Sequence, residues 1–258
     1  MPSHKENVVD QFTRQALPFS TAAPIRDEAA LDLIVGASGA GPDDDVLDVA
    51  CGPGLVACAF ARKSRRVTGI DLTPAMLERA REVAREQGIE NVEWRHGDVL
   101  PLPFPDASFS IVVSRFAFHH FETPLAVLKE MCRVCRPGGR VVLVDLHASS
   151  DPAKARAFHE MEVLRDPSHA RALPLDELRA LFRDAGLLAP AETFYDMRLE
   201  LEGYLERAFP APGDEEKIRR IFEDAVADDA LGLGVRRKGD RILFRLPIAI
   251  LVSALPEN

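Results

Sequence analysis

The chain has 258 residues, of which 47% are hydrophobic, and its formal net charge at pH 7 is −9. This length fits one large α/β domain or one domain with a small cap. The negative charge argues against a duplex nucleic-acid substrate, because such a substrate needs a surface that neutralises phosphates. We find neither an apolar run long enough to cross a membrane nor the apolar segment of a signal peptide, and therefore expect a cytoplasmic protein without a membrane span.

The predicted elements alternate between helices and strands. In chain order they are helices over 4–17 and 27–38, a strand over 46–50, a helix that ends near residue 64, a strand over 66–71, a helix from Thr73 to Gly88, strands over 92–96 and 109–114, a helix over 123–135 and a strand over 140–146. We expect the hydroxyl of Thr73 to cap its helix, because Pro74 follows at the first helical position.

The second half is less regular. It predicts helices over 151–166, 174–185 and 214–230, and strands over 192–201 and 241–251. Pro247 falls inside the last strand and favours an edge or bulge position for it. Strands that alternate with helices are typical of a doubly wound, mostly parallel α/β sheet, here with seven predicted strands. Such sheets bind ligands at the carboxyl ends of their strands.

The four cysteines include the C-x-x-C pair Cys132 and Cys135. Both lie in a helical pattern, and no second Cys or His pair nearby completes a zinc site. We therefore expect these two thiols in the core and predict no metal site.

A glycine loop follows the first predicted strand, with the sequence Asp48-Val49-Ala50-Cys51-Gly52-Pro53-Gly54. Glycines let the backbone approach a ligand closely and expose the N–H groups of the helix that follows. Asp71 ends the next strand, where a carboxylate can hold both hydroxyls of a ribose. The spacing of Gly52, Gly54 and Ala57 also fits the dinucleotide fingerprint. Asp48 would repel a pyrophosphate but suits an ammonium, and this favours S-adenosylmethionine.

At this point the chain resembles the class I S-adenosylmethionine-dependent methyltransferases, whose first motif reads D-x-G-x-G-x-G; Ala50 takes the place of the first glycine. The segments that follow resemble the small-molecule type 11 branch, which includes the ubiquinone and menaquinone methyltransferases. Residues 96–110 match its "GD…LPF…SFD" block, residues 115–121 its "ALHHF" segment, and residues 133–139 its "R-V-L-K-P-G-G" turn.

The resemblance implies a Rossmann-like methyltransferase fold with S-adenosylmethionine as cofactor. It implies a single domain over 1–258, with a helical lid over 1–38, a cofactor-binding core over 40–147 and a C-terminal half over 148–258 whose helices cap the acceptor pocket. Asp48 would contact the methionine ammonium, Asp71 the ribose and Asp98 the adenine amino group. The implied cofactor-binding residues are Asp48, Ala50, Gly52, Gly54, Asp71, Leu72, Met76, Asp98, Val99, Ser114 and Phe116.

The acceptor side is less defined. Two adjacent histidines follow the fourth strand, and we favour His119, or His169 further on, as a catalytic base or substrate ligand. Further candidate substrate contacts are Arg115, His147, Asp166 and Arg171. The D/N-P-P-Y/F tetrad, a Pro-Cys nucleophile and the metal ligands of catechol-type enzymes are missing. We therefore predict a metal-independent reaction on a small molecule, at N, O or C.

The N-terminal segment and residues 165–171 also resemble bacterial secondary-metabolite methyltransferases, including the azapteridine N-methyltransferase of toxoflavin biosynthesis. We expect a monomer or weak homodimer. Two alternatives stay open: a nicotinamide-dependent oxidoreductase, for which a Tyr-x-x-x-Lys pair is missing, and a non-catalytic protein that binds the same cofactor.

Overall fold

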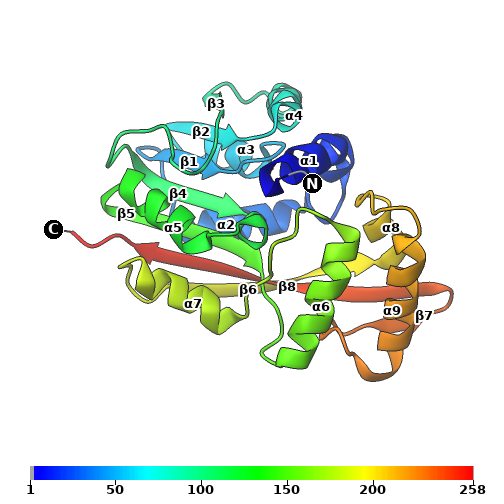
Figure 1. The fold of residues 1–258 in the computed structure, drawn as a ribbon. Coiled ribbons are helices and arrows are strands. Elements are labelled where there is room, and N and C mark those ends of the chain that lie inside the picture. Colours follow the sequence, from blue (N-terminus) through cyan, green and yellow to red (C-terminus); the bar gives the residue numbers. More distant parts are fainter. Residues whose placement is uncertain (1–2, 258) are drawn as a thin grey trace.

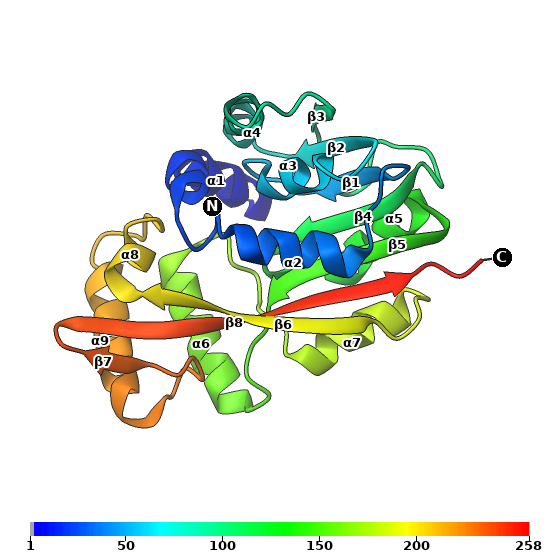
Figure 2. The same ribbon diagram turned by 180° about the vertical axis from the view of Figure 1, so that it is seen from behind.

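The computed structural model describes residues 3–257, and its centre is one sheet of eight strands (Figures 1 and 2). The strands are β1 (Asp45–Val49), β2 (Arg66–Asp71), β3 (Val92–His96), β4 (Phe109–Arg115), β5 (Cys135–Leu146), β6 (Ala191–Glu200), β7 (Arg236–Lys238) and β8 (Arg241–Ala254). Their order is β3-β2-β1-β4-β5-β8-β6, and β7 pairs with β8. The first five strands are parallel, whereas β8 runs antiparallel to β5 and β6.

Helices cover both faces of this sheet. They are α1 (His4–Thr21), α2 (Glu28–Ser38), α3 (Leu55–Ala61), α4 (Pro74–Glu86), α5 (Pro124–Val134), α6 (Pro152–Arg165), α7 (Leu175–Asp184), α8 (Leu201–Leu205) and α9 (Asp214–Asp228), with the 3-10 turn η1 (Phe118–His120) after β4. Helices α5 and α7 pack on one face, and α2 and α3 pack on the other (Figures 1 and 2). The fold is the predicted doubly wound, mostly parallel α/β class.

Two parts of the predicted sheet were wrong. The short strand β7 pairs with the start of β8 and makes the sheet eight-stranded instead of seven-stranded. Its three residues are basic and exposed, so the sequence has no apolar pattern there that would predict a strand. Strand β8 is central, although Pro247 favoured an edge. Pro247 pairs with Asp196 of β6, and its carbonyl oxygen accepts the N–H of His147 at 3.1 Å, just past the last β5–β8 residue pair. The missing N–H of Pro247 therefore falls where β5 ends.

Two helix termini also differ from the prediction. Thr73 precedes α4 but makes no side-chain capping hydrogen bond; instead its backbone N–H donates to Asp71 Oδ1 at 2.8 Å. Helix α1 continues past Pro18 to Thr21, and the Thr21 hydroxyl donates to the Leu17 carbonyl at 3.0 Å.

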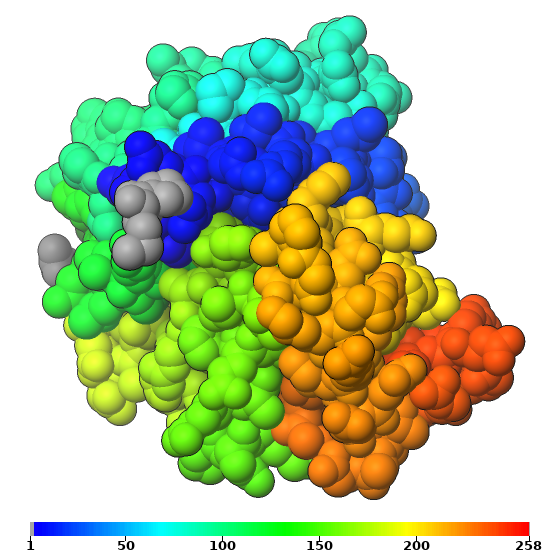
Figure 3. All heavy atoms as spheres, turned by 45° about the vertical axis from the view of Figure 1, so that its right-hand side comes forward, coloured from blue at the N-terminus to red at the C-terminus, as the bar shows by residue number. Residues whose placement is uncertain are grey.

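Helix α1 joins the two halves of the molecule. In the space-filling view the blue N-terminal segment lies between the cyan first half and the green and orange segments (Figure 3). Gln11 donates to the Ala208 carbonyl, and Gln15 donates to Asp166 Oδ2 at 3.2 Å. Within residues 3–257, none of the helices combines the length and apolar character needed to span a membrane.

Candidate active site

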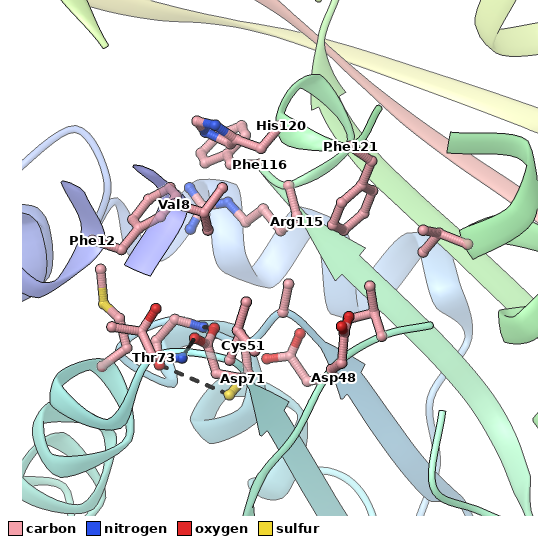
Figure 4. A pocket seen from close by; sticks show the side chains of 18 of the residues that line it. Val8, Phe12, Asp48, Cys51, Asp71, Thr73, Arg115, Phe116, His120 and Phe121 are labelled. Carbon is pink, nitrogen blue, oxygen red and sulfur yellow. Dashed lines mark hydrogen bonds between the residues drawn. The ribbon is translucent and has the colours of Figure 1, made fainter. Parts of the chain in front are cut away.

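A pocket lies at the carboxyl ends of β1, β2 and β4, beneath α1. Figure 4 shows two facing walls. One carries the labelled residues Asp48, Cys51, Asp71 and Thr73, and the other carries Val8, Phe12, Arg115, Phe116, His120 and Phe121. The parallel strands therefore bring polar side chains from separate loops to one edge of the sheet, as the topology predicts.

Asp48 is the most unusual group in this pocket. It lies near the end of β1, between Gly69 of β2 and Val113 of β4, and is 1% exposed. Its Oδ2 atom has no hydrogen-bond partner in the described part of the chain. Burial raises the pKa of Asp48 to about 8; the Asp71 charge adds to this rise, while the backbone N–H of Ala57 and the Arg115 charge oppose it. Within residues 3–257 no hydrogen-bond partner reaches Oδ2 of this buried carboxylate, and an opposite charge nearby would favour its ionised form.

The glycine loop turns sharply after β1. Ala50 has φ +55°, a left-handed conformation that costs an L-residue roughly 1–2 kcal/mol. Gly52 also has a positive φ, and its backbone N–H donates to Asp71 Oδ2 at 2.8 Å. Gly54 does not line the pocket, because its open side faces the ring of Trp94, which a Cβ atom would overlap. Its role in the structure is close packing under β3.

Asp71 ends β2 and is 8% exposed. Burial raises its pKa, and hydrogen bonds from the backbone N–H groups of Thr73 and Gly52 oppose the rise. These two bonds, both 2.8 Å, hold one oxygen each and leave each oxygen a further lone pair. The fixed carboxylate can therefore accept two more hydrogen bonds from vicinal hydroxyl groups.

Asp98 follows β3 and makes contact with helix α1. Its Oδ2 atom lies 2.5 Å from Lys5 Nζ of α1, and its Oδ1 atom accepts the N–H of Leu100 at 3.2 Å. Burial would raise the pKa of Asp98, but the hydrogen bond and charge of Lys5 outweigh it and lower the pKa. Asp98 thus presents an ionised carboxylate at the rim of the pocket.

Most of the predicted cofactor residues lie together. The pocket is lined by Asp48, Ala50, Gly52, Asp71, Leu72, Met76, Asp98, Val99 and Phe116. Ser114 does not reach it, because the residue is fully buried and its hydroxyl donates to the Val49 carbonyl at 2.9 Å. Of the predicted acceptor contacts, Arg115 lines the pocket. Its Nη1 donates to the Ile25 carbonyl, whereas Nε and Nη2 have no hydrogen-bond partner within residues 3–257.

The two predicted catalytic histidines do not line the pocket. His119 turns toward β5, where its Nδ1 lies 2.7 Å from Asp145 Oδ1 and its backbone N–H donates to Asp145 Oδ2. Burial would lower the pKa of His119, but the charge and hydrogen bond of Asp145 raise it. His169 is buried beside His119 and His120, and burial and these two rings lower its pKa.

The other predicted acceptor residues also lie outside the pocket lining. Asp166 is buried and accepts hydrogen bonds from Ser168 and Gln15. Arg171 is exposed and pairs with Glu177 at 2.5 Å. His147 packs its ring near Phe194, with 6.3 Å between the ring centroids.

Of the two adjacent histidines, His120 lines the pocket and His119 does not, although the sequence favoured His119; His4 of α1 also lines the pocket. The two histidines point in different directions because His119 bonds to Asp145 and His120 bonds to Ser168. Both partners lie far along the chain, so no local sequence pattern distinguishes the two histidines. Among the described residues, no group of three or more His, Cys, Asp or Glu side chains is placed to hold a metal ion. All four cysteines are free and buried, including Cys132 and Cys135.

Comparisons with known proteins agree with this arrangement. The family described as "Methyltransferase domain" matches residues 47–143. The uncharacterized methyltransferase YcgJ of Bacillus subtilis is 34% identical over 248 residues, which cover 92% of this chain and 97% of that protein. The demethylmenaquinone methyltransferase of Listeria welshimeri is 36% identical over 118 residues, which cover 45% of this chain and 50% of that protein.

The crystal structure of Bacillus subtilis YcgJ superposes with a TM-score of 0.82 at 29% identity, over 90% of this chain and 100% of that one. The likeness thus extends well beyond residues 47–143, which the family model matches. The chain belongs to the class I S-adenosylmethionine-dependent methyltransferases, in their type 11 branch.

Proposed function

We propose that this methyltransferase acts on a small-molecule acceptor without a metal ion, and that its cofactor lies along the wall of Asp48, Asp71 and Asp98. The observation that carries the proposal is the buried Asp48 carboxylate, which lacks a partner for Oδ2 in the described chain and lines the pocket. A ligand that brings an ammonium to this carboxylate supplies the missing partner. Asp71 then holds the ribose hydroxyls, and Asp98 accepts from the adenine amino group.

The cofactor supplies a methyl group that the positive charge of a sulfonium already activates. The protein contributes position and exclusion of water. Such placement is worth about 7–11 kcal/mol of a reaction barrier. The apolar side chains of α1, Val8 and Phe12, cover the pocket opposite the glycine loop and support a lid role for residues 1–38 (Figure 4). On this proposal, residues 40–147 bind the cofactor, and the C-terminal half supports the acceptor side.

The acceptor atom, N, O or C, stays open in this proposal. Three phenylalanines, Phe12, Phe116 and Phe121, line the wall that faces the carboxylates and support a flat acceptor. We place the reaction in cofactor or secondary-metabolite biosynthesis, with azapteridine N-methylation of the toxoflavin type as the narrowest candidate. We further propose a cytoplasmic monomer or weak homodimer.

A nicotinamide-dependent oxidoreductase is the main alternative. A pyrophosphate beside Gly52 would approach Asp48 and Asp71, and this charge arrangement disfavours it. A non-catalytic protein would bind the cofactor with the same residues, and only consumption of the methyl donor separates it from the enzyme.

Calorimetry with S-adenosylhomocysteine and with NAD tests the cofactor assignment. We expect S-adenosylhomocysteine to bind and NAD not to bind. Asp71→Asn should weaken binding by roughly 10- to 100-fold, because a hydrogen bond to a charged group contributes about 1.5–3 kcal/mol. Asp32→Asn, an exposed change on α2, is the matched control. Binding of NAD alone, or normal affinity in Asp71→Asn with the fold intact, would contradict the proposal.

A further inference from the structure

His120 lies on the pocket wall that faces Asp48 and Asp71 (Figure 4). It ends the η1 turn after β4 and is 7% exposed. Its ring meets Phe12 of α1 edge-on, with 4.9 Å between the ring centroids and 77° between the planes. The lid helix and the turn after β4 thus hold the imidazole from two sides.

The hydrogen bonds of His120 determine its tautomer. Nδ1 lies 2.9 Å from the Ser168 carbonyl oxygen, which can only accept a hydrogen bond. It also lies 3.1 Å from Ser168 Oγ, and that hydroxyl donates its own proton to Asp166 Oδ1 at 2.5 Å. Both partners therefore accept, and Nδ1 must carry the proton. The lone pair of the neutral ring is then on Nε2.

Nε2 of His120 makes no hydrogen bond within residues 3–257 and is not sealed from solvent, whereas both ring nitrogens of the neighbouring His169 are sealed. Burial and the charge of His119 lower the pKa of His120 to about 4, against the opposing charge of Asp166. The ring is therefore unprotonated at neutral pH. The charged or titratable groups on the elements around it are His119, Glu122, His4, Lys5, Arg115, Asp145, Asp166 and His169.

We propose that His120 Nε2 is the proton acceptor of this methyltransferase, and that the acceptor substrate is a planar molecule with an ionisable O–H or N–H group. This inference rests on the proposed function. As the oxygen or nitrogen of the substrate forms its new bond to the methyl carbon, its proton moves to Nε2. The bond between that carbon and sulfur breaks, and its electron pair stays on sulfur. The imidazolium then releases its proton to solvent.

Two neighbours support this step. Asp166 is linked to the ring through Ser168 Oγ and stabilises the positive charge that His120 acquires. Arg115 lies over the ring of Phe116, 4.2 Å from its centroid, and its charge stabilises the negative charge that grows on the acceptor as the proton leaves. The phenylalanines that line this wall offer aromatic surface for a flat ring, and this points to phenols and N–H heterocycles.

His120→Asn tests the assignment, because asparagine can still donate to the Ser168 carbonyl but has no atom at the Nε2 position. His119→Asn is its counterpart, since it keeps a donor toward Asp145 and lies outside the pocket lining. We expect S-adenosylhomocysteine affinity to change less than about twofold in both variants. If the wild type itself did not bind S-adenosylhomocysteine, that result would contradict the proposed function.

Ring ¹⁵N NMR of the wild type, with His120→Asn used to assign the signal, gives a readout besides activity. We expect an Nδ1–H tautomer that stays neutral down to about pH 5. A protonated Nε2 at neutral pH would overturn the proposal.

Methyl transfer to a panel of phenols and azoles completes the test. His120→Asn should lower kcat by about 10²-fold with little change in KM, the lower end of the range for a positioned base, because a pKa of about 4 makes the ring a weak base. The loss should shrink with 4-nitrophenolate, which is already ionised, compared with 4-methylphenol. Three results would each overturn the proposal. One is an equal rate of methyl transfer for His120→Asn and the wild type, and another is a loss of activity in His119→Asn alone. The third is that no member of the panel binds or is methylated.

Discussion

Asp48 combines a buried position on β1 with an oxygen, Oδ2, that has no hydrogen-bond partner in residues 3–257. The side chain is buried between neighbouring parallel strands, and its pKa is about 8 because burial disfavours the charged form. An isolated buried carboxylate is costly, and an opposite charge within a few ångströms favours its ionised form. In the proposed function, a ligand ammonium beside Asp48 offsets the cost of burying its charge, and this raises the affinity for that ligand.

This linkage predicts a pH-dependent affinity for S-adenosylhomocysteine. In the free protein Asp48 is protonated below about pH 8, whereas the bound ammonium lowers its pKa. Binding therefore releases a proton, and affinity should rise with pH from 6 to 8, by up to about tenfold per unit, and then level off. Calorimetry at three pH values, in buffers with different ionisation heats, measures both effects.

Asp48→Asn is the control for this experiment. The variant should bind more weakly at pH 8, and its slope with pH should be lost because no proton remains to be released. An affinity that stays constant between pH 6 and 8 in the wild type would contradict an ammonium partner for Asp48.

The sequence predicts the positions of the three pocket carboxylates better than the positions of the two adjacent histidines. Asp48, Asp71 and Asp98 each stand near the end of a parallel strand, so the order of strands alone brings them to one pocket edge. His119 and His120 are neighbours on one turn, and their directions depend on partners 26 and 48 residues away. No local pattern contains these contacts.

Helix α1 acts as a bridge over the pocket at the scale of elements. Its buried face carries Gln11 and Gln15, which bond to the Ala208 carbonyl and to Asp166 in the second half of the chain. Its first turn carries Lys5, which pairs with Asp98 in the first half. The Lys5 pair is half-exposed and contributes little on its own, as surface ion pairs do. The buried amides therefore contribute more to the position of the helix than the Lys5 pair does.

Gln11→Ala combined with Gln15→Ala should loosen α1 while the sheet stays folded. Each buried group left without a partner costs about 1–3 kcal/mol. We expect faster hydrogen exchange of α1 amides and at least tenfold weaker binding of S-adenosylhomocysteine. Thr13→Ala is the control, because this exposed hydroxyl donates only within α1, to the Val9 carbonyl. Unchanged exchange in α1 of the double variant would show that other contacts hold this helix.

Element boundaries were predictable where apolar runs end at charged residues. Strands β2 and β3 begin and end at the predicted residues. Strand β5 begins five residues earlier than predicted, at Cys135, because Phe109 pairs with Cys135 before the register shifts toward Ile111 and Arg140. The Pro137-Gly138-Gly139 turn, which indicates a helix end, gives no sign of this pairing.

The sheet is completed only by the end of the chain. Strand β8 lies between β5 and β6 and pairs with β5 from Arg140 to Leu146. The central residues of β5, from Val141 to Val144, are buried. The strands that end at the pocket and the strands of the C-terminal half therefore share one sheet, although the family model matches residues 47–143 alone.

A chain that ends after His147 should fail to form a stable cofactor domain. It would leave the edge of β5 unpaired, and a long apolar edge strand is a site of aggregation. We expect residues 1–147 to aggregate on expression, and co-expression with residues 148–258 to restore soluble protein. A chain that ends at Pro256, which keeps all of β8, is the control. Size-exclusion chromatography measures the outcome: a monomeric 1–147 fragment that binds S-adenosylhomocysteine would show that the first half folds without β8.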